Sequence, residues 1–300
     1  MLSMQLLRRI YPQARISLLT DTISHPILTQ SPTQILTLVD DCQVVPLEQP
    51  EMLVRSRELK TRARCLLEGD FVFIDSDALP IRPFAEVFAQ DFEVAAVLDR
   101  NSIRPFPHFP DWFNGLFDQL GWARPTRHYF DSGLVFWKDT PGTRRLSQLW
   151  TEAWRHQQVL SGRHFDQPSF NHVLDHHQAH TLVLDVSYNA MLRASPWFGK
   201  AAKILHFHIA DFEAGADDLL GHLLQFWQKT GQVDWAMVER VRQAPYSLVT
   251  PPDHLGFLLG TGHYRRAARL LLRKLAQALK KPAMIRDFLQ DKLIRRNRTK

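Results

Sequence analysis

Phe71-Val-Phe-Ile-Asp-Ser-Asp-Ala-Leu-Pro80 is the stretch of sequence that decides the fold. Its four apolar residues, Phe71 to Ile74, predict a central strand that is covered on both sides. Two carboxylates, Asp75 and Asp77, follow at once, and the ligands of open α/β sheets bind where strands end. The stretch therefore predicts a site at the carboxyl end of a buried strand.

Predicted strands and helices alternate on both sides of this stretch. Strands are predicted at 15–20, 43–47, 94–98, 133–137, 181–184 and 204–207, and helices at 2–10, 53–67, 84–89, 143–157 and 168–177. The alternation predicts an α/β fold with a single, mostly parallel, twisted sheet flanked by helices. The polar, aromatic and Pro-rich residues 101–128 suit a lid.

The composition suits one large globular domain with an appendage. Of the 300 residues, 45% are hydrophobic and 23% charged. We expect a catalytic domain at 1–210 and a helical extension at 211–300. Two Cys exclude a disulfide scaffold and favour a reducing compartment. The sequence shows neither a signal peptide nor a run of about 20 apolar residues, so we expect a cytoplasmic protein, peripheral at the membrane if its tail binds lipid.

Positive charge is concentrated at the C-terminal end. Residues 264–300 hold 13 Lys and Arg against two acids, which leaves the rest of the chain at −5 within a total of +6. A net-negative body argues against a nucleic-acid binder. Apolar and basic residues of 264–300 fall on separate helical faces. Two interpretations stay open: helices that pack on the body, or a basic amphipathic anchor on an anionic membrane surface.

Asp75 and Asp77 are candidate metal ligands. Two carboxylates at i and i+2, on a turn leaving a strand, can face one hard divalent cation. Mn²⁺ or Mg²⁺ prefers oxygen ligands and bridges them to the oxygens of a diphosphate. A cation there would stabilise the charge of a departing nucleoside diphosphate. Such pairs also occur on ordinary solvated turns, so the pattern alone is a weak signal.

Four further segments carry polar groups that could join this site. They are Arg57 with Lys60 on a predicted helix, Asp131-Ser132-Gly133 at the start of a strand, Asp166-Gln167 before a helix, and His206 in a strand. Each also has a structural alternative. The basic helix face could be merely solvated, Asp166 could be a helix N-cap, and His206 could be an ordinary core histidine.

Taken in order, these segments resemble glycosyltransferase family 8 and its GT-A relatives. The matching stretches are 56–60, 71–80, 130–135, 165–167 and 203–207, and 183–189 is similar to the family's strand leading to a Tyr-Asn pair. The resemblance extends over roughly residues 15 to 210. It implies a nucleotide-sugar donor, preferably UDP-linked, Mn²⁺, and transfer with retention of anomeric configuration. The basic tail suggests a glycan or lipid-linked acceptor, such as a bacterial surface polysaccharide or lipopolysaccharide.

The resemblance also implies a role for each site residue. Asp75, Asp77 and His206 would hold the metal, and Asp166 and Gln167 would face the donor sugar and the reacting centre. Asp131, Ser132 and Gly133 would form the sugar subsite, with Asp131 standing where the family usually has Asn. Donor binding would fall to Arg57, Lys60, Ser76, Thr20 and Asp21. Catalysis would rest on leaving-group electrostatics and positioning, without a strong nucleophile.

The chain differs from the family pattern at two places. The family's Gly-Pro-x-Lys-Pro-Trp segment after the metal His is replaced by Ala210-Asp-Phe-Glu-Ala-Gly215. The family also begins with a strand that contacts the nucleotide base, whereas this chain begins at the helix that follows. We therefore expect the natural start to lie upstream.

Two other functions fit parts of the sequence. A phosphohydrolase of the haloacid dehalogenase kind also places DxD after an apolar strand. However, Leu79 stands where that class usually has Thr or Val, and no clear Asp-Asp partner follows a later strand. A degenerate glycosyltransferase fold could instead bind a glycan or a membrane without catalysis.

Overall fold

The computed structural model describes residues 1–30, 35–99, 111–125, 128–192, 196–207, 219–243, 255, 259 and 264–280. Two compact units make up the chain, Met1–Val249 and Thr250–Lys300. The boundary expected at 210 falls inside the first unit. Residues 101–110 and 126–127 of the predicted lid, and the whole of 210–215, lie outside the described residues.

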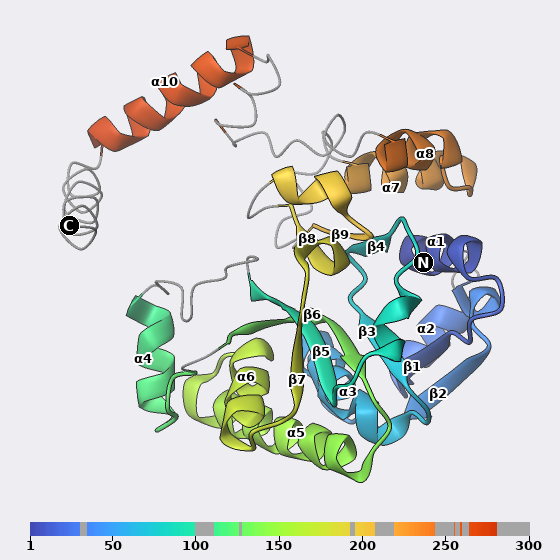
Figure 1. The fold of residues 1–300 in the computed structure, drawn as a ribbon, viewed down its shortest axis with the longest axis vertical. Coiled ribbons are helices and arrows are strands. Elements are labelled where there is room, and N and C mark those ends of the chain that lie inside the picture. Colours follow the sequence, from blue (N-terminus) through green and yellow to red (C-terminus); the bar gives the residue numbers. More distant parts are fainter. Residues whose placement is uncertain are drawn as a thin grey trace. The chain divides into compact units, whose positions relative to one another are not determined.

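Helices and strands alternate along the first unit (Figure 1). Its helices are α1 (Leu2–Ile10), α2 (Ser24–Gln30), α3 (Met52–Leu66), α4 (Asp111–Gln119), α5 (Pro141–Ser161), α6 (Gln167–His176), α7 (Leu219–Thr230) and α8 (Trp235–Gln243). Its strands are β1 (Ser17–Asp21), β2 (Asp41–Val45), β3 (Phe71–Ile74), β4 (Ala78–Pro80), β5 (Val94–Leu98), β6 (Phe130–Trp137), β7 (Thr181–Leu184), β8 (Ala190–Met191) and β9 (Ile204–His206). The predicted α/β class with flanking helices is confirmed.

The described strands pair in three groups, with the orders β1-β2, β3-β6-β5-β7 and β4-β9-β8. The pairs β1-β2, β5-β7 and β8-β9 are parallel, and the pairs β3-β6, β5-β6 and β4-β9 are antiparallel. The pairing is thus mixed, and the expectation of one mostly parallel sheet needs correction. Leu98, the last residue of β5, pairs with Phe130, the first of β6. The connection between β5 and β6 thus begins and ends at the same end of these two strands, so β6 runs antiparallel to β5.

Strand β6 is one of the two inner strands of the four-stranded group, and both of its faces are buried. One face of the four-stranded group packs against α5 and α6 through a cluster that includes Trp137, Trp150 and Phe170. The opposite face packs against β8, β9 and the short helical turn at Ala85–Ala89. A further apolar cluster joins α1, α7 and α8 to β4 and β9, which explains why the first unit extends beyond residue 210.

Strand β3 lies at the end of its hydrogen-bonded group, and its residues are half-buried rather than fully covered. Its apolar run still has a physical reason on each face. The Arg64 guanidinium lies 4.6 Å from the ring centre of Phe71, so a cation from α3 covers that side. Val72 and Ile74 pack into the cluster on the other side.

Helix α3 is buried on nearly all sides, although it carries many charges. It packs against α5, where the Ser147 hydroxyl donates to the carbonyl of Thr61 at 2.7 Å and Arg155 binds the buried carboxylate of Glu58. The predicted basic face of α3 is therefore largely buried, since Lys60 and Arg64 are 5% and 1% exposed, and only the Arg57 side chain keeps 30% of its surface exposed. This packing gives the cations of α3 fixed positions.

The described part of the second unit consists of Leu255, Leu259 and α10 (Tyr264–Lys280). Ala267 and Leu270 are buried and pack against Leu255. Leu271, Leu272 and Leu275 are exposed. In the part of the chain that the structure describes, no helix has both the length and the apolar content to cross a bilayer.

Replacement of Trp154 tests the packing of α5. This side chain is fully buried, so Trp154→Ala should lower the free energy of unfolding by about 3–5 kcal/mol. Val159→Ala changes a residue of the same helix that is 83% exposed, and should cost less than about 0.5 kcal/mol. Urea unfolding followed by tryptophan fluorescence measures both. Equal costs for the two variants would contradict the packing described.

Candidate metal and donor site

The Asp75-Ser-Asp77 turn is held at both ends by backbone hydrogen bonds. The amide of Asp75 donates to the carbonyl of Gly133 at 2.8 Å, and the amide of Ala78 donates back to the carbonyl of Asp75 at 3.0 Å. Strand β4 follows and pairs with β9, which sets Ala78 opposite His206. A turn after β3 and a distant strand thus meet through sheet register.

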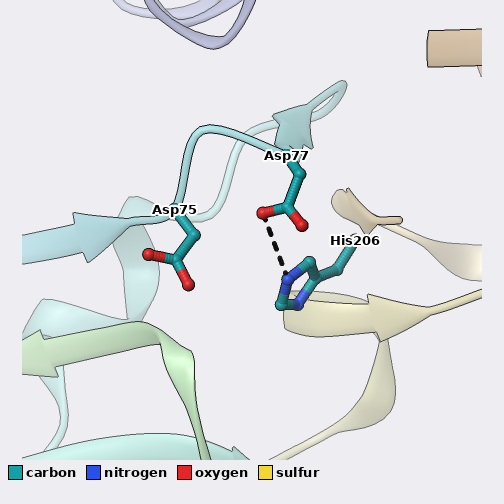
Figure 2. Close-up of side chains that lie close together, drawn as sticks. All are labelled: Asp75, Asp77 and His206. Carbon is teal, nitrogen blue, oxygen red and sulfur yellow. Dashed lines mark ion pairs between the residues drawn. The ribbon is translucent and has the colours of Figure 1, made fainter. Parts of the chain in front are cut away.

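Asp75, Asp77 and His206 come together as the sequence predicted (Figure 2). One ligand atom from each lies within 4.8 Å of the others. Two ligands on opposite sides of one divalent ion are about 4–5 Å apart, so the spacing suits a single cation. The aspartates keep 25% and 23% of their side chains exposed, whereas His206 keeps 3%. The donor set of two carboxylate oxygens and one imidazole suits a divalent cation and is open on the aspartate side.

Burial and neighbouring carboxylates both act on the pKa values of this cluster. Burial raises the pKa of Asp75, and Asp166 adds to this against the opposing effect of Lys60. Burial alone would lower the pKa of His206, but the carboxylates of Asp77, Asp131 and Asp75 outweigh it and raise the pKa. The cluster attracts positive charge, and a divalent cation supplies it without protons.

Gly133 lies against the ligand cluster. A Cβ at this position would stand 2.6 Å from Cε1 of His206 and 2.8 Å from Oδ2 of Asp75. These distances are shorter than real Cβ contacts, and both neighbours are proposed ligands. The absence of a side chain at 133 is what lets Asp75 and His206 approach each other.

Asn189 connects His206 to Asp131. Oδ1 of Asn189 lies 2.8 Å from Nδ1 of His206, and Nδ2 of Asn189 donates to Oδ1 of Asp131 at 2.8 Å. The amide of Gly133 also donates to Oδ1 of Asp131, at 2.9 Å. Asp131, predicted for the sugar subsite, is 2% exposed and directs this oxygen toward the metal cluster.

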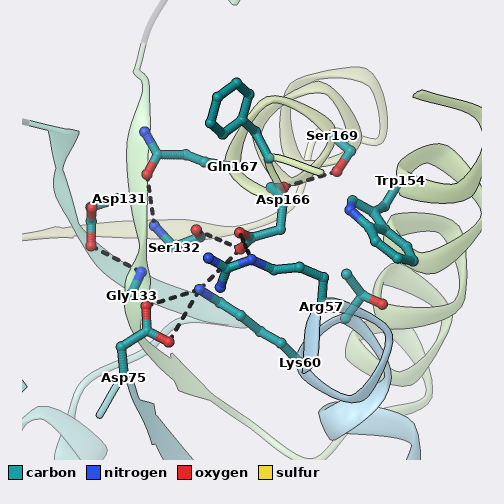
Figure 3. Close-up of polar contacts among 12 residues, drawn as sticks. Arg57, Lys60, Asp75, Asp131, Ser132, Gly133, Trp154, Asp166, Gln167 and Ser169 are labelled. Carbon is teal, nitrogen blue, oxygen red and sulfur yellow. Dashed lines mark hydrogen bonds and ion pairs between the residues drawn. The ribbon is translucent and has the colours of Figure 1, made fainter. Parts of the chain in front are cut away.

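Asp166 and Lys60 form the centre of a second network (Figure 3). The Lys60 ammonium lies 2.9 Å from Oδ2 of Asp166 and 3.1 Å from Oδ2 of Asp75, and so joins the metal cluster to α6. Arg57, 30% exposed at its side chain, reaches Oδ1 of Asp166 at 3.3 Å. Burial would raise the pKa of Asp166, but Lys60 and Arg57 outweigh it and lower the pKa to about 2.

Asp166 precedes α6, yet its side chain makes no capping hydrogen bond. Its carboxylate instead accepts from the Ser132 hydroxyl at 2.8 Å, and its carbonyl accepts from Ser169 and Trp150. Oε1 of Gln167 accepts from the amide of Ser132 at 3.3 Å. The N-cap alternative therefore does not account for this carboxylate, and Asp166 and Gln167 both face the start of β6.

The remaining predicted donor contacts lie in different surroundings. Asp21 is buried at the end of β1, where it accepts from the amide and hydroxyl of Ser24 and lies 2.9 Å from Nε of Arg55. These contacts connect β1 to α2 and α3, which gives Asp21 a structural role. Thr20 is buried in the same strand, and Ser76 is exposed in the DxD turn.

Asp99 and Tyr129 are polar groups near the site that no sequence pattern had identified. Asp99 follows β5 directly and is 6% exposed, and its amide donates to the carbonyl of Tyr129 at 2.8 Å. Burial, together with Asp99, raises the pKa of Tyr129 well above its usual value. The signal for Asp99 is the same as for Asp75, an acid directly after an apolar strand.

No protein-family model matches the chain, and no curated protein matches it by sequence. Several solved structures resemble it in part. GlyE, a glycosyltransferase of Streptococcus pneumoniae TIGR4, aligns with a TM-score of 0.47 and 16% identity over 83% of this chain. The chain covers 61% of GlyE. Mouse xyloside xylosyltransferase 1 aligns with a TM-score of 0.42 and 12% identity, over 69% of this chain and 90% of that one. The bifunctional glycosyltransferase WbbM aligns with a TM-score of 0.41 and 15% identity, over 77% of this chain and 52% of that one. All three scores are below 0.5, so the proposals below rest on the residues of the site.

A methyl group at position 133 should disturb the metal cluster. Gly133→Ala should weaken Mn²⁺ binding by about 10- to 100-fold, because the new Cβ displaces Asp75 or His206. Electron paramagnetic resonance of free Mn²⁺ measures the affinity. Gly115→Ala in α4 is the matched control, because a Cβ there meets nothing within 4 Å. Unchanged affinity in Gly133→Ala would contradict the site described.

The low pKa of Asp166 predicts a contribution to acid stability. Its folded pKa is about 2 against an ordinary 3.8, so its stabilisation is complete above about pH 4 and is lost as the pH falls through about 2. Asp166→Asn should therefore flatten the fall in unfolding free energy over that range, by about 2 kcal/mol. Thermal unfolding at stepped pH measures this. Asp91→Asn, at a carboxylate that is 99% exposed, should keep the wild-type slope. The same slope in Asp166→Asn would refute the assignment.

Proposed function

We propose that the protein is a metal-dependent glycosyltransferase of the GT-A type, which transfers a sugar from a nucleoside diphosphate. One observation supports this most. Segments that are far apart in the sequence, and whose residues and order resemble those of family 8, meet at one site in space. They contribute Lys60 and Arg57, the Asp75 turn, the start of β6, Asp166 and His206.

The proposed donor places its diphosphate beside Asp75 and Asp77. A bound Mn²⁺ or Mg²⁺ would act there as a Lewis acid on the departing phosphate oxygen. The guanidinium of Arg57 is partly exposed and presents planar donors that suit phosphate oxygens. Lys60 is buried between Asp75 and Asp166, so its main part in this proposal is to keep both carboxylates ionised and in place.

Asp166, Gln167 and Ser132 would orient the donor sugar. Asp166 stays ionised near neutral pH, because its pKa is about 2. Its carboxylate is hydrogen-bonded to Ser132 and paired with two cations, which makes it a poor nucleophile and a fixed acceptor for sugar hydroxyls. Catalysis in this proposal comes from leaving-group stabilisation and positioning.

The phosphohydrolase alternative is less well supported. It would use Asp75 as nucleophile and would need a partner Asp-Asp site. In the structure the third group at Asp75 and Asp77 is the imidazole of His206. A UDP-sugar donor, hexosyl transfer, retention of configuration, and a glycan or lipid-linked acceptor follow from the sequence resemblance and the tail, and are proposals on that basis.

We also propose that α10 binds an anionic membrane surface. Between 264 and 280 the chain has six Lys and Arg and no acid. Leu271, Leu272 and Leu275 are 45%, 66% and 51% exposed. A helix with exposed leucines and only positive charges suits the boundary of an anionic bilayer. Such contact would bring the enzyme to a lipid-linked or surface-glycan acceptor.

Release of nucleotide from a panel of UDP- and GDP-sugars tests the catalytic proposal. The wild-type protein should release nucleotide with Mn²⁺ and not with excess chelator, and Asp77→Ala should abolish the release because a ligand is lost. Asp91→Ala, an exposed acid far from the ligand set, should retain it. If no donor is hydrolysed, and no nucleotide with Mn²⁺ raises the melting temperature, the fold acts as a binding module instead.

Vesicle flotation tests the membrane proposal. The full chain should float with vesicles that contain an anionic lipid and not with neutral ones. Replacement of Leu271, Leu272 and Leu275 by Asn should abolish flotation and leave donor hydrolysis unchanged. The matched control replaces Val159 and Leu160, which are 83% and 47% exposed on α5. If the leucine variant has a lower melting temperature and the wild type does not float, the leucines pack on protein.

A further inference from the structure

We infer that Asp131 and Asn189 are positioning residues which fix the tautomer of His206, so that Nε2 is the nitrogen offered to the metal. This deepens the proposed function and rests on its metal site. Its basis is the chain of contacts from Gly133 through Asp131 and Asn189 to His206, all within 3 Å from atom to atom.

Asp131 determines which groups donate and which accept along this chain of contacts. One of its oxygens receives the amide N–H of Gly133 at 2.9 Å and Nδ2 of Asn189 at 2.8 Å. The fixed backbone N–H of Gly133 makes this oxygen an acceptor. The amide of Asn189 must therefore turn its NH₂ group toward Asp131, and its oxygen toward the opposite side.

That orientation determines the proton on His206. Oδ1 of Asn189 lies 2.8 Å from Nδ1 of His206, and an amide oxygen can only accept. Nδ1 must then carry the proton, which leaves the lone pair of the neutral ring on Nε2. This nitrogen lies 3.5 Å from Oδ1 of Asp77, on the side of the metal cluster. Metal-bound histidines are oriented in this way by a partner on the other ring nitrogen.

Burial makes the chain of contacts effective. Asp131, Asn189 and His206 are 2%, 0% and 3% exposed, so bulk water does not compete for these atoms. A carboxylate at position 131 also removes an ambiguity. An amide in its place could present either its oxygen or its NH₂ group, and Asn189 could then turn over and present NH₂ to Nδ1.

The experiment determines the tautomer directly. Long-range ¹H–¹⁵N spectra of protein with ¹⁵N-labelled histidine distinguish a protonated from an unprotonated ring nitrogen, and His206→Gln identifies the signal. Spectra at about pH 9, where an ordinary imidazole is neutral, and with Mg²⁺ should show Nδ1 protonated in the wild type. In Asp131→Asn the tautomer with the proton on Nε2 should appear, and Mn²⁺ affinity should fall by about 10- to 100-fold.

Two further variants keep the outcome decisive. Asn189→Leu removes both hydrogen bonds at similar volume and should also release the tautomer, whereas Asp185→Asn changes an exposed acid that caps Ser187 and should alter nothing. A merely electrostatic role of Asp131 would weaken Mn²⁺ binding without changing the tautomer, and this would overturn the inference. A wild-type proton on Nε2 would also overturn it. If the wild type binds no Mn²⁺, the proposed function fails, while the spectra still decide the tautomer.

Discussion

The site depends on the ion pairs that the buried ammonium of Lys60 makes. The ammonium lies between the carboxylates of Asp75 and Asp166, which come from a turn after β3 and from the start of α6. Without it, these two carboxylates would share a poorly solvated region and repel each other. Removal of one partner from such a buried group costs about 3–5 kcal/mol, because the remaining charge is uncompensated. The packing of α3 against α5 is what keeps the ammonium in place.

The two aspartates of the metal cluster could be predicted from the sequence, because their signal is local, whereas His206 was expected as a ligand only through the family resemblance. An apolar strand followed at once by two acids predicts both a position and a ligand type, and Asp75 and Asp77 are brought together with His206 as expected. The α/β class was equally accessible, because strand and helix patterns alternate. Asp99 also follows an apolar strand directly, as Asp75 does. The pattern alone therefore does not show which of the two acids belongs to the metal cluster.

The mixed sheet and the role of Asn189 could not be predicted from the sequence, because both depend on contacts between residues that are far apart in the chain. Strand direction at β6 is fixed by where the long connection returns, and no local pattern records that. The half-buried β3 reads in sequence like a central strand, since cations of α3 cover its aromatic rings in place of apolar residues. Arg57 and Lys60 share a helix face, and only the fold shows that one is partly exposed and the other buried.

The charges of the described site explain why a divalent cation suits it. Asp75, Asp77, Asp131 and Asp166 face the permanent cations Lys60 and Arg57, which leaves two negative charges when His206 is neutral. The carboxylates around His206 raise its pKa, so a proton is drawn into this imbalance. A divalent ion would remove it while leaving every carboxylate ionised. The diphosphate of a donor would then add negative charge beside Arg57, so the cation and the substrate would each stabilise the binding of the other.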